Sequence, residues 1–231
     1  MELKAAKQQF SEIASVYHDI EDTEVYEHDE PEEDIRPAES QPIASMEVLI
    51  EKNKDTYAWL NVEGTNMDYP VMFTPGNPEF YLRRNFDGQD SIAGTPFFDG
   101  RFKEEADNYI IYGHNMKNGT MFADLIRYKN KTFFDDHPVI RLTTLYREIE
   151  YEVIAAFYSE LHIFRNTFPW YEYISFESEP HFFEFVEQLE NESLFPLPVN
   201  LEYGDKFITL ATCSYHDATG RFIVIGREVK N

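Results

Sequence analysis

The sequence predicts a mostly β fold, a closed or nearly closed β-barrel with a helical appendage at the N-terminus and one helix inserted late in the chain. Short runs rich in Val, Ile, Tyr, Phe and Thr recur from residue 59 onward, and these residue types favour strands. Few stretches show the apolar periodicity of a helix. No internal repeat divides the chain, so the many short strands are expected to close into one barrel.

The first forty residues differ from the rest of the chain. Apolar residues recur at helical spacing from Leu3 to Tyr17, which predicts a helix there. The segment from Asp19 to Ile35 is strongly acidic and contains no lysine or arginine, which is typical of a solvated linker; metal binding is the alternative. We therefore expect two parts, a helix and acidic linker over residues 1–40 and a barrel domain over residues 41–231.

The barrel domain is expected to begin with a second helix, from Ile43 to Lys54. A short helix should follow Thr120, and a longer one should run from Pro180, which suits a helix start, to Glu192. The predicted strands are Trp59–Val62, Met67–Phe73, Tyr109–Tyr112, Val139–Leu142, Ile149–Phe157, Lys206–Cys213 and Arg221–Val229.

Charge and hydropathy limit the function. A net charge of -23 repels phosphate backbones, so nucleic acid is not an expected partner. No apolar run reaches the roughly 18 residues of a membrane span, and no signal-peptide pattern follows Met1. The chain as given is expected to be soluble, and it could be the soluble part of an anchored protein.

The single cysteine, Cys213, lies where it could react. Two β-rich runs flank a connector of turn-forming residues, Ser214 to Gly220, which predicts an antiparallel hairpin. Such a hairpin would set Cys213 opposite Arg221, and a guanidinium beside a thiol favours the thiolate and can bind a developing oxyanion. Arg227 shares the strand face of Arg221 but lies roughly 20 Å farther along, so we interpret it as a surface charge.

A thiol enzyme also needs a proton donor for the leaving amine, and histidine is the usual one. Of the seven histidines, two stand out by position. His114 follows a predicted strand at Gly113, in a polar loop of the kind that carries functional residues. His216 lies three residues after Cys213 in the hairpin connector. Spacing favours His114, with His216 as the alternative.

These residues resemble the motifs of sortases. The run Thr-Leu-Ala-Thr-Cys at residues 209–213 resembles the TLxTC signature of that family. Arg221 resembles its catalytic arginine, and Tyr-Gly-His-Asn-Met at residues 112–116 resembles the segment with its catalytic histidine. The three motifs occur in the order that the family has.

The class B members of the family are the most similar. Residues 59–65 and 68–71 resemble their opening strands, and the insert from about Ser159 to Leu201 resembles their insert with its long helix. The N-terminal helix and the Phe-Phe and His-Pro pairs within residues 133–138 also fit that class. The resemblance covers roughly Ile43 to Val229 and leaves the acidic segment unmatched.

The resemblance implies a sortase-type barrel and a cysteine transpeptidase. Cys213 would attack the Thr carbonyl of a C-terminal sorting signal, of the LPxTG or NPxTx kind, and form a thioacyl enzyme. His114 would protonate the leaving nitrogen, and Arg221 would stabilise the oxyanion. An amine would then release the product. No cofactor and no metal are implied.

The same resemblance implies the partners and the location. The substrates would be surface proteins with a C-terminal sorting signal, and the acceptor would be an amine of the peptidoglycan precursor or, alternatively, of a pilin. The enzyme would act on the extracellular face of the cell membrane, held by an N-terminal anchor that this chain does not contain.

Substrate contacts are predicted less directly. Asn77 or Leu82 could match a residue that class B enzymes use for recognition, and Thr212, Ser214 and Tyr215 flank the nucleophile. Ordinary loop or strand packing is the alternative for these positions. Two other functions remain open for the whole chain: a cysteine hydrolase that releases a free acid, and a catalytically silent β-barrel binding module at the cell envelope.

Overall fold

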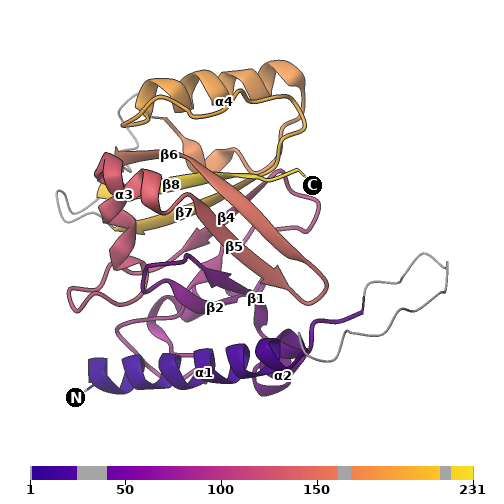
Figure 1. Cartoon of the computed structure of the whole chain (residues 1–231), viewed down its shortest axis with the longest axis vertical. Coiled ribbons are helices and arrows are strands. Elements are labelled where there is room, and N and C mark those ends of the chain that lie inside the picture. The colour runs from indigo at the N-terminus through magenta and orange to yellow at the C-terminus, as the bar shows by residue number, and fades with distance from the viewer. Residues whose placement is uncertain (1, 25–40, 161–167, 214–219, 231) are drawn as a thin grey trace.

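A closed β-barrel forms the centre of the protein. The computed structural model describes residues 2–24, 41–160, 168–213 and 220–230. Within these residues, eight strands close in the order β1-β2-β3-β4-β7-β8-β6-β5 (Figure 1). The strands are β1 Thr56–Asn61, β2 Asp68–Met72, β3 Phe97–Phe98, β4 Asn108–Tyr112, β5 Val139–Thr144, β6 Glu148–Glu160, β7 Phe207–Cys213 and β8 Gly220–Glu228. The predicted mostly β barrel is confirmed; the two-residue strand β3 is too short to give a sequence pattern.

Most neighbouring strands in the barrel are antiparallel, but two pairs are parallel. β2 runs parallel to β3, and β4 runs parallel to β7. A parallel pair needs a long crossover, and the one between β4 and β7 contains β5, β6 and the late helix. This crossover brings together two strand ends that lie about a hundred residues apart in the sequence.

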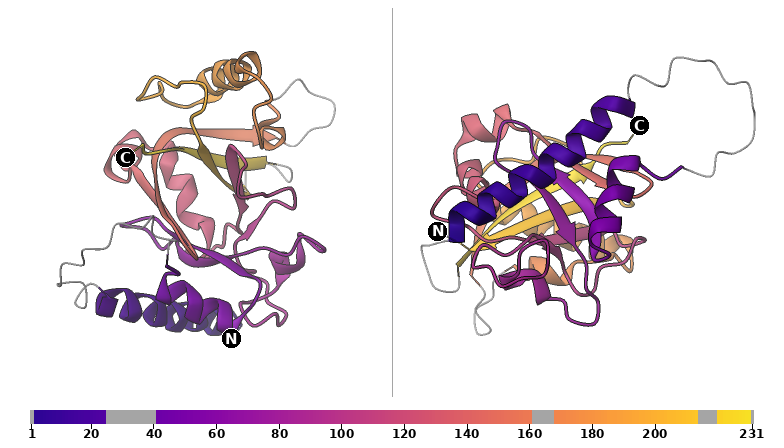
Figure 2. Two further views of the ribbon diagram at one scale, coloured as in Figure 1. Left: turned by 90° about the vertical axis from the view of Figure 1, so that its right-hand side faces the viewer. Right: turned by 90° about the horizontal axis from the view of Figure 1, so that it is seen from below.

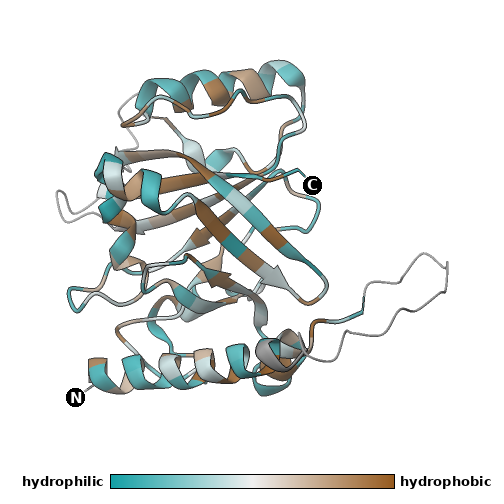
Figure 3. Cartoon of the chain, viewed as in Figure 1, coloured by the Kyte–Doolittle hydropathy of each residue, from teal (hydrophilic) through white to brown (hydrophobic). Residues whose placement is uncertain are grey.

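Side chains of one strand divide between the barrel interior and the outer surface because they alternate along the strand. Ala58 and Leu60 of β1 belong to the interior core, whereas Trp59 packs outward with the N-terminal helix. Figure 3 shows brown, hydrophobic segments on the strands of the barrel and on parts of the helices that cover it. A shift of one residue in the register of β1 would therefore turn Trp59 into the core.

Helices pack around the barrel, and the longest of them cover two opposite sides of it. They are α1 Glu2–Glu24, α2 Ala44–Lys52, η1 Phe80–Arg83, η2 Phe122–Lys129, α3 Lys131–Asp136, η3 Trp170–Glu172 and α4 Glu179–Glu192, where η marks a 3₁₀ helix. In Figure 1, α4 lies above the strands, and α1 and α2 lie below them. The predicted N-terminal and late helices are confirmed, and α3 was not predicted.

Helix α1 packs on the barrel through one apolar stripe. Ala6, Phe10, Ile13 and Tyr17 are buried in a cluster with residues of β1 and β2. The ring of Tyr17 stacks on Trp59 with centroids 4.4 Å apart. Burial of each large apolar side chain contributes roughly 1.5–3 kcal/mol, so this stripe is enough to dock the helix. Both views in Figure 2 show α1 lying along the barrel.

Helix α1 is longer than predicted. Its backbone stays helical to Glu24, so residues 19–24 are not linker as the acidic composition suggested. Acidic residues at a helix C-terminus oppose the helix dipole. Contacts near that end compensate, because His18 Nε2 lies 2.9 Å from the carboxylate of Asp68 on β2. Residues 25–35 of the acidic segment lie outside the described residues, and the boundary at residue 40 stays a prediction.

Helix α4 packs on the opposite side of the barrel. Phe182, Phe185 and Leu189 are fully buried and share a cluster with the outward residues of β7 and β8. The helix begins at a Ser178 N-cap, whose hydroxyl accepts from the His181 N–H, and Pro180 lies in its first turn. Among the described helices, none has both the length and the apolar character that crossing a membrane requires.

Candidate active site

The ends of β4 and β7 bring the predicted histidine and cysteine to one edge of the barrel. In this parallel pair, Tyr112 is opposite Ala211, and the Gly113 N–H donates to the Ala211 carbonyl at 3.2 Å. Because parallel strands end at the same edge, His114 and Cys213 both follow directly from this junction. The side chain of Cys213 lies outside the described residues, but its backbone completes β7.

The β7/β8 ladder sets the arginine beside the cysteine. Cys213 is the backbone partner of Arg221, which confirms the predicted pairing of these two positions. The Nη1 of Arg221 donates to the Gly220 carbonyl at 3.1 Å. At the other end of the ladder, Arg227 is opposite Phe207 and pairs with Glu152 on β6 at 3.3 Å. The two arginines therefore lie at opposite ends of β8.

Thr212 ties the cysteine strand to the histidine loop. Its side chain is buried, and its hydroxyl donates to the Gly113 carbonyl at 2.7 Å. Gly113 precedes His114, so this bond fixes the point at which the histidine loop leaves β4. A Cβ on Gly113 would lie 2.6 Å from the ring of Phe122, so only glycine fits at this exit.

The His114 ring is held by a backbone carbonyl. Its Nε2 lies 2.7 Å from the carbonyl oxygen of Leu82 on η1. A carbonyl oxygen only accepts, so this contact assigns the proton to Nε2 and leaves Nδ1 to exchange a proton. Burial, together with the charges of Arg83 and Arg221, lowers the pKa of His114 below its ordinary value, against the hydrogen bond to Leu82. This lowered pKa favours the neutral form of the imidazole.

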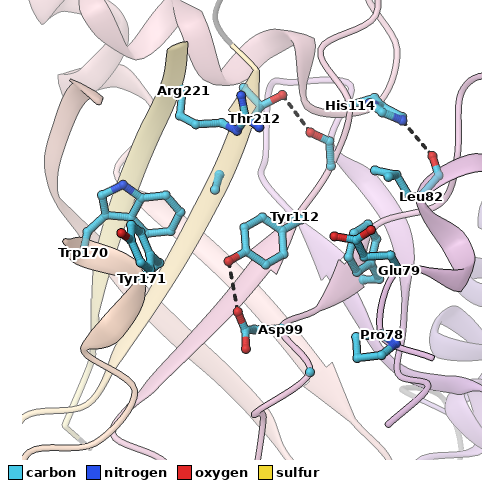
Figure 4. Close-up of a pocket in the computed structure, with 14 residues that line it drawn as sticks. Pro78, Glu79, Leu82, Asp99, Tyr112, His114, Trp170, Tyr171, Thr212 and Arg221 are labelled. Carbon is cyan, nitrogen blue, oxygen red and sulfur yellow. Dashed lines mark hydrogen bonds between the residues drawn. The ribbon is translucent and has the colours of Figure 1, made fainter. Parts of the chain in front are cut away.

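A cavity of about 530 Å³ opens beside these groups. It is lined by Pro78, Glu79, Leu82, Phe97, Asp99, Gly100, Tyr112, Gly113, His114, Trp170, Tyr171, Ala211, Thr212 and Arg221. Figure 4 shows Arg221 and Thr212 at one end, Trp170 on one side, and His114 with Leu82 on the other. Apolar walls with a few polar groups are typical of a ligand-binding site.

An ion pair forms the far end of the cavity. The Asp99 carboxylate accepts two hydrogen bonds from the Arg101 guanidinium and one from the Tyr112 hydroxyl. Burial would raise the pKa of Asp99, but these bonds and the charge of Arg101 lower it overall. Arg101 also donates to the Tyr171 carbonyl at 2.6 Å, so the same guanidinium holds the Trp170–Tyr171 wall.

The remaining predicted positions divide into three groups. Leu82 and Thr212 line the cavity. Asn77 is exposed and not among the lining residues, although the adjacent Pro78 and Glu79 are. Ser214, Tyr215 and His216 lie outside the described residues. The substrate-binding roles of all these positions stay predictions.

Sequence reasoning missed much of the cavity wall. Asp99, Tyr112, Trp170 and Tyr171 line it, and none was proposed as a functional residue. The aromatic run Phe-Pro-Trp-Tyr at residues 168–171 was the available signal, because large aromatics cluster at binding sites. In the part of the chain that the structure describes, no group of three His, Cys, Asp or Glu side chains is arranged to hold a metal ion.

The chain is similar to known proteins over most of its length. The family described as "Sortase domain" matches residues 60–229. Sortase B of Listeria monocytogenes is 32% identical over 185 residues, which cover 78% of this chain and 72% of that protein. The structure of a Staphylococcus aureus sortase B-substrate complex aligns with a TM-score of 0.82 and 25% identity over 100% of this chain and 99% of that one. Clostridium perfringens sortase B aligns with a TM-score of 0.72 and 29% identity, over 80% and 99% of the two chains.

Proposed function

Because this chain belongs to the sortase family of cysteine transpeptidases, we propose that it cleaves a C-terminal sorting signal after Thr and transfers the new carboxyl end to an amine of the cell wall. The observation that carries this proposal is the meeting of three groups at one barrel edge. Cys213 ends β7, Arg221 is its partner on β8, and His114 leaves the adjacent strand β4 beside the same cavity.

In the first half-reaction, the sulfur of Cys213 attacks the Thr carbonyl carbon. The neutral imidazole of His114 takes the thiol proton and then gives it to the departing amide nitrogen. The C–N bond breaks, and a thioacyl enzyme remains. The lowered pKa of His114 supports this sequence, because an imidazole that is neutral in the free enzyme can accept that proton.

Arg221 has two tasks in this proposal. Its fixed positive charge favours the thiolate of Cys213, and its guanidinium stabilises the negative charge on the carbonyl oxygen in the tetrahedral intermediate. The direct backbone pairing of the two positions supports both tasks, since paired residues on one face of an antiparallel ladder have β-carbons about 5 Å apart.

In the second half-reaction, an amine attacks the thioester carbonyl. The amine proton passes to His114 and returns to the sulfur, so the enzyme ends as it began. We propose an amine of the peptidoglycan precursor as the acceptor; a pilin amine is the alternative. The family resemblance supports a location at the extracellular face of the cell membrane.

The signal is proposed to be of the NPxTx or LPxTG kind and to bind as an extended peptide in the cavity. The structural likeness to a sortase B-substrate complex supports the binding of a substrate by this fold. The apolar walls formed by Leu82, Phe97 and Trp170 would hold the residues before the Thr, and Arg221 would hold the scissile carbonyl at the other end.

The test is a panel of quenched fluorescent peptides that carry candidate signals, incubated with and without triglycine and analysed by mass spectrometry. We expect cleavage after Thr and a triglycine adduct with the wild type, and neither with Cys213→Ala. A free acid as the only product in the presence of triglycine would indicate a hydrolase. No cleavage of any peptide, with Cys213 resistant to alkylation in the folded protein, would indicate a binding module.

A further inference from the structure

The loop that carries His114 ends in a strained residue. Met121 has φ 57 and ψ -134, and it is the one non-glycine residue with positive φ among those described. It is also buried, with 1% of its surface exposed. Residues other than glycine keep such a backbone only where the surroundings enforce it, and such residues gather at functional sites.

Backbone contacts join Met121 directly to the histidine. Met121 forms an antiparallel bridge with Asn115, and the N–H of Phe122 donates to the His114 carbonyl at 2.9 Å. The ring of Phe122 also fills the space over Gly113. Residues 113–122 therefore form a closed loop, and the conformation of Met121 sets the position of His114 at its base.

One side chain from outside the loop enforces this conformation. The N–H of Met121 donates to the hydroxyl oxygen of Tyr69 on β2 at 3.1 Å. The two residues are 52 positions apart in the sequence. Tyr69 is 6% exposed, and burial raises its pKa to about 12, so the hydroxyl stays protonated. Without this acceptor, a buried N–H would lose its partner at a residue that is already strained.

Helix α1 fixes the Tyr69 ring from its other side. The ring of Phe10 meets Tyr69 edge-on, with centroids 5.4 Å apart and an interplanar angle of 81°. Gln9, the preceding residue, donates to the Asp87 carboxylate at 2.6 Å, in the loop that follows η1. Helix α1 therefore contacts Tyr69 itself and the loop that directly follows η1, the element that supplies the Leu82 carbonyl.

We propose that Tyr69 is a positioning residue for His114: its hydroxyl holds Met121 in its strained conformation, and Met121 closes the loop that presents the imidazole to Cys213. The proposal rests on the proposed transpeptidase function. Tyr69 does not line the cavity, so it acts through the loop and not by contact with substrate.

The test compares Tyr69→Phe with Tyr128→Phe. The first variant keeps the ring and its Phe10 contact and removes one hydroxyl. The second removes the hydroxyl of another buried tyrosine, which lies on η2, the helix that directly follows Met121. That hydroxyl donates to the His137 carbonyl at 2.8 Å. We expect Tyr69→Phe to lower kcat about tenfold with KM nearly unchanged, because a misplaced catalytic group slows the chemical step. Tyr128→Phe should keep kcat within about twofold at a similar loss of Tm.

A second measurement does not depend on turnover. NMR titration of the His114 ring, assigned with His114→Gln, should give a higher pKa in Tyr69→Phe than in wild type or Tyr128→Phe. In wild type, burial of the His114 ring and the charges of Arg83 and Arg221 lower that pKa. In Tyr69→Phe the ring would be less buried and farther from these two arginines. The same kcat and His114 pKa in both tyrosine variants would overturn the proposal. The proposed function and the positioning role can also fail separately. If wild type cleaves no peptide but the pKa of His114 is still higher in Tyr69→Phe, the transpeptidase function is overturned and the positioning role of Tyr69 is supported.

Discussion

The two sides of the cavity are built in different ways. On the cysteine side, Cys213 and Arg221 belong to one continuous antiparallel ladder, which also pairs with β6. On the histidine side, His114 lies in a loop that is held by a carbonyl 32 positions away and by a tyrosine 52 positions from Met121. The pairing in the ladder follows from neighbouring sequence, whereas the position of the loop depends on separate elements that must all be in place.

The largest effect should come from the histidine itself. His114→Ala should reduce kcat by roughly 10²–10⁴, because it removes the group that we propose moves the proton. His216→Ala should keep most of the activity, and steady-state cleavage of the preferred peptide measures both. Loss of activity in His216→Ala and not in His114→Ala would show that the proton donor lies in the connector after Cys213. The comparison of a cysteine side with a histidine side of the cavity would then be wrong.

The arginines of β8 give the next effect. Arg221→Ala should reduce kcat/KM by about 10²–10³, the usual loss when a group that stabilises an oxyanion is removed. Arg227→Ala is the matched control, since it lies on the same strand and pairs with Glu152 at the far end. We expect a change of less than about threefold, because this partly exposed ion pair lies at the far end of β8 from Cys213. Equal losses of kcat/KM in the two variants would contradict the role of the Cys213–Arg221 pairing.

Gly94→Ala should disturb the histidine side alone. Gly94 has φ +63, and a Cβ there would lie 2.6 Å from the Leu82 carbonyl oxygen that holds His114. Displacement of this oxygen should lower kcat by about tenfold or more. Gly76→Ala is the control, because nothing lies within 4 Å of its added Cβ. Unchanged kcat in a folded Gly94→Ala protein would mean that the Leu82 carbonyl does not orient the imidazole.

The smallest effect concerns the docking of α1. Burial alone would lower the pKa of His18, but the hydrogen bond and charge of Asp68, with Glu21, raise it overall. A histidine whose pKa is raised by folding stabilises the folded state when it is protonated. This contribution to the free energy of unfolding is fully present below the pKa of the unfolded chain, about 6.5, and is lost as the pH rises through the pKa of the folded protein. His18 is partly exposed, so the effect should be about 0.5 kcal/mol.

Thermal unfolding of wild type and His18→Gln at about pH 5.5 and about pH 8.5 measures this contribution. The Tm difference between the two proteins should be larger at the lower pH. Asp68→Asn should remove the same pH-dependent part, because it takes away the partner of the imidazolium. A Tm difference between wild type and His18→Gln that does not change with pH would show that the His18–Asp68 pair does not hold the helix.

The fold was predictable because its signals are local. Strand alternation, turn-forming residues and the helical stripe of α1 each lie within a few consecutive residues, so the sequence predicted the barrel, both end helices and the Cys213–Arg221 pairing. The prediction failed where composition and tertiary contact disagree. The acidic composition of residues 19–24 predicted a linker, yet α1 continues to Glu24. The contact of His18 with Asp68 on β2 holds the helix just before this segment.

The candidate site was predictable only in part. By itself, the sequence determined the strands other than β3, the cysteine with its opposing arginine, and a preference between two histidines. Only the tertiary structure decided which carbonyl holds His114, that Tyr69 supports the strained Met121, and that Asp99 and Trp170 line the cavity. The physical reason is the range of the interactions: pairing within a hairpin follows from adjacent residues, whereas these contacts exist only after the barrel has closed and brought distant segments together.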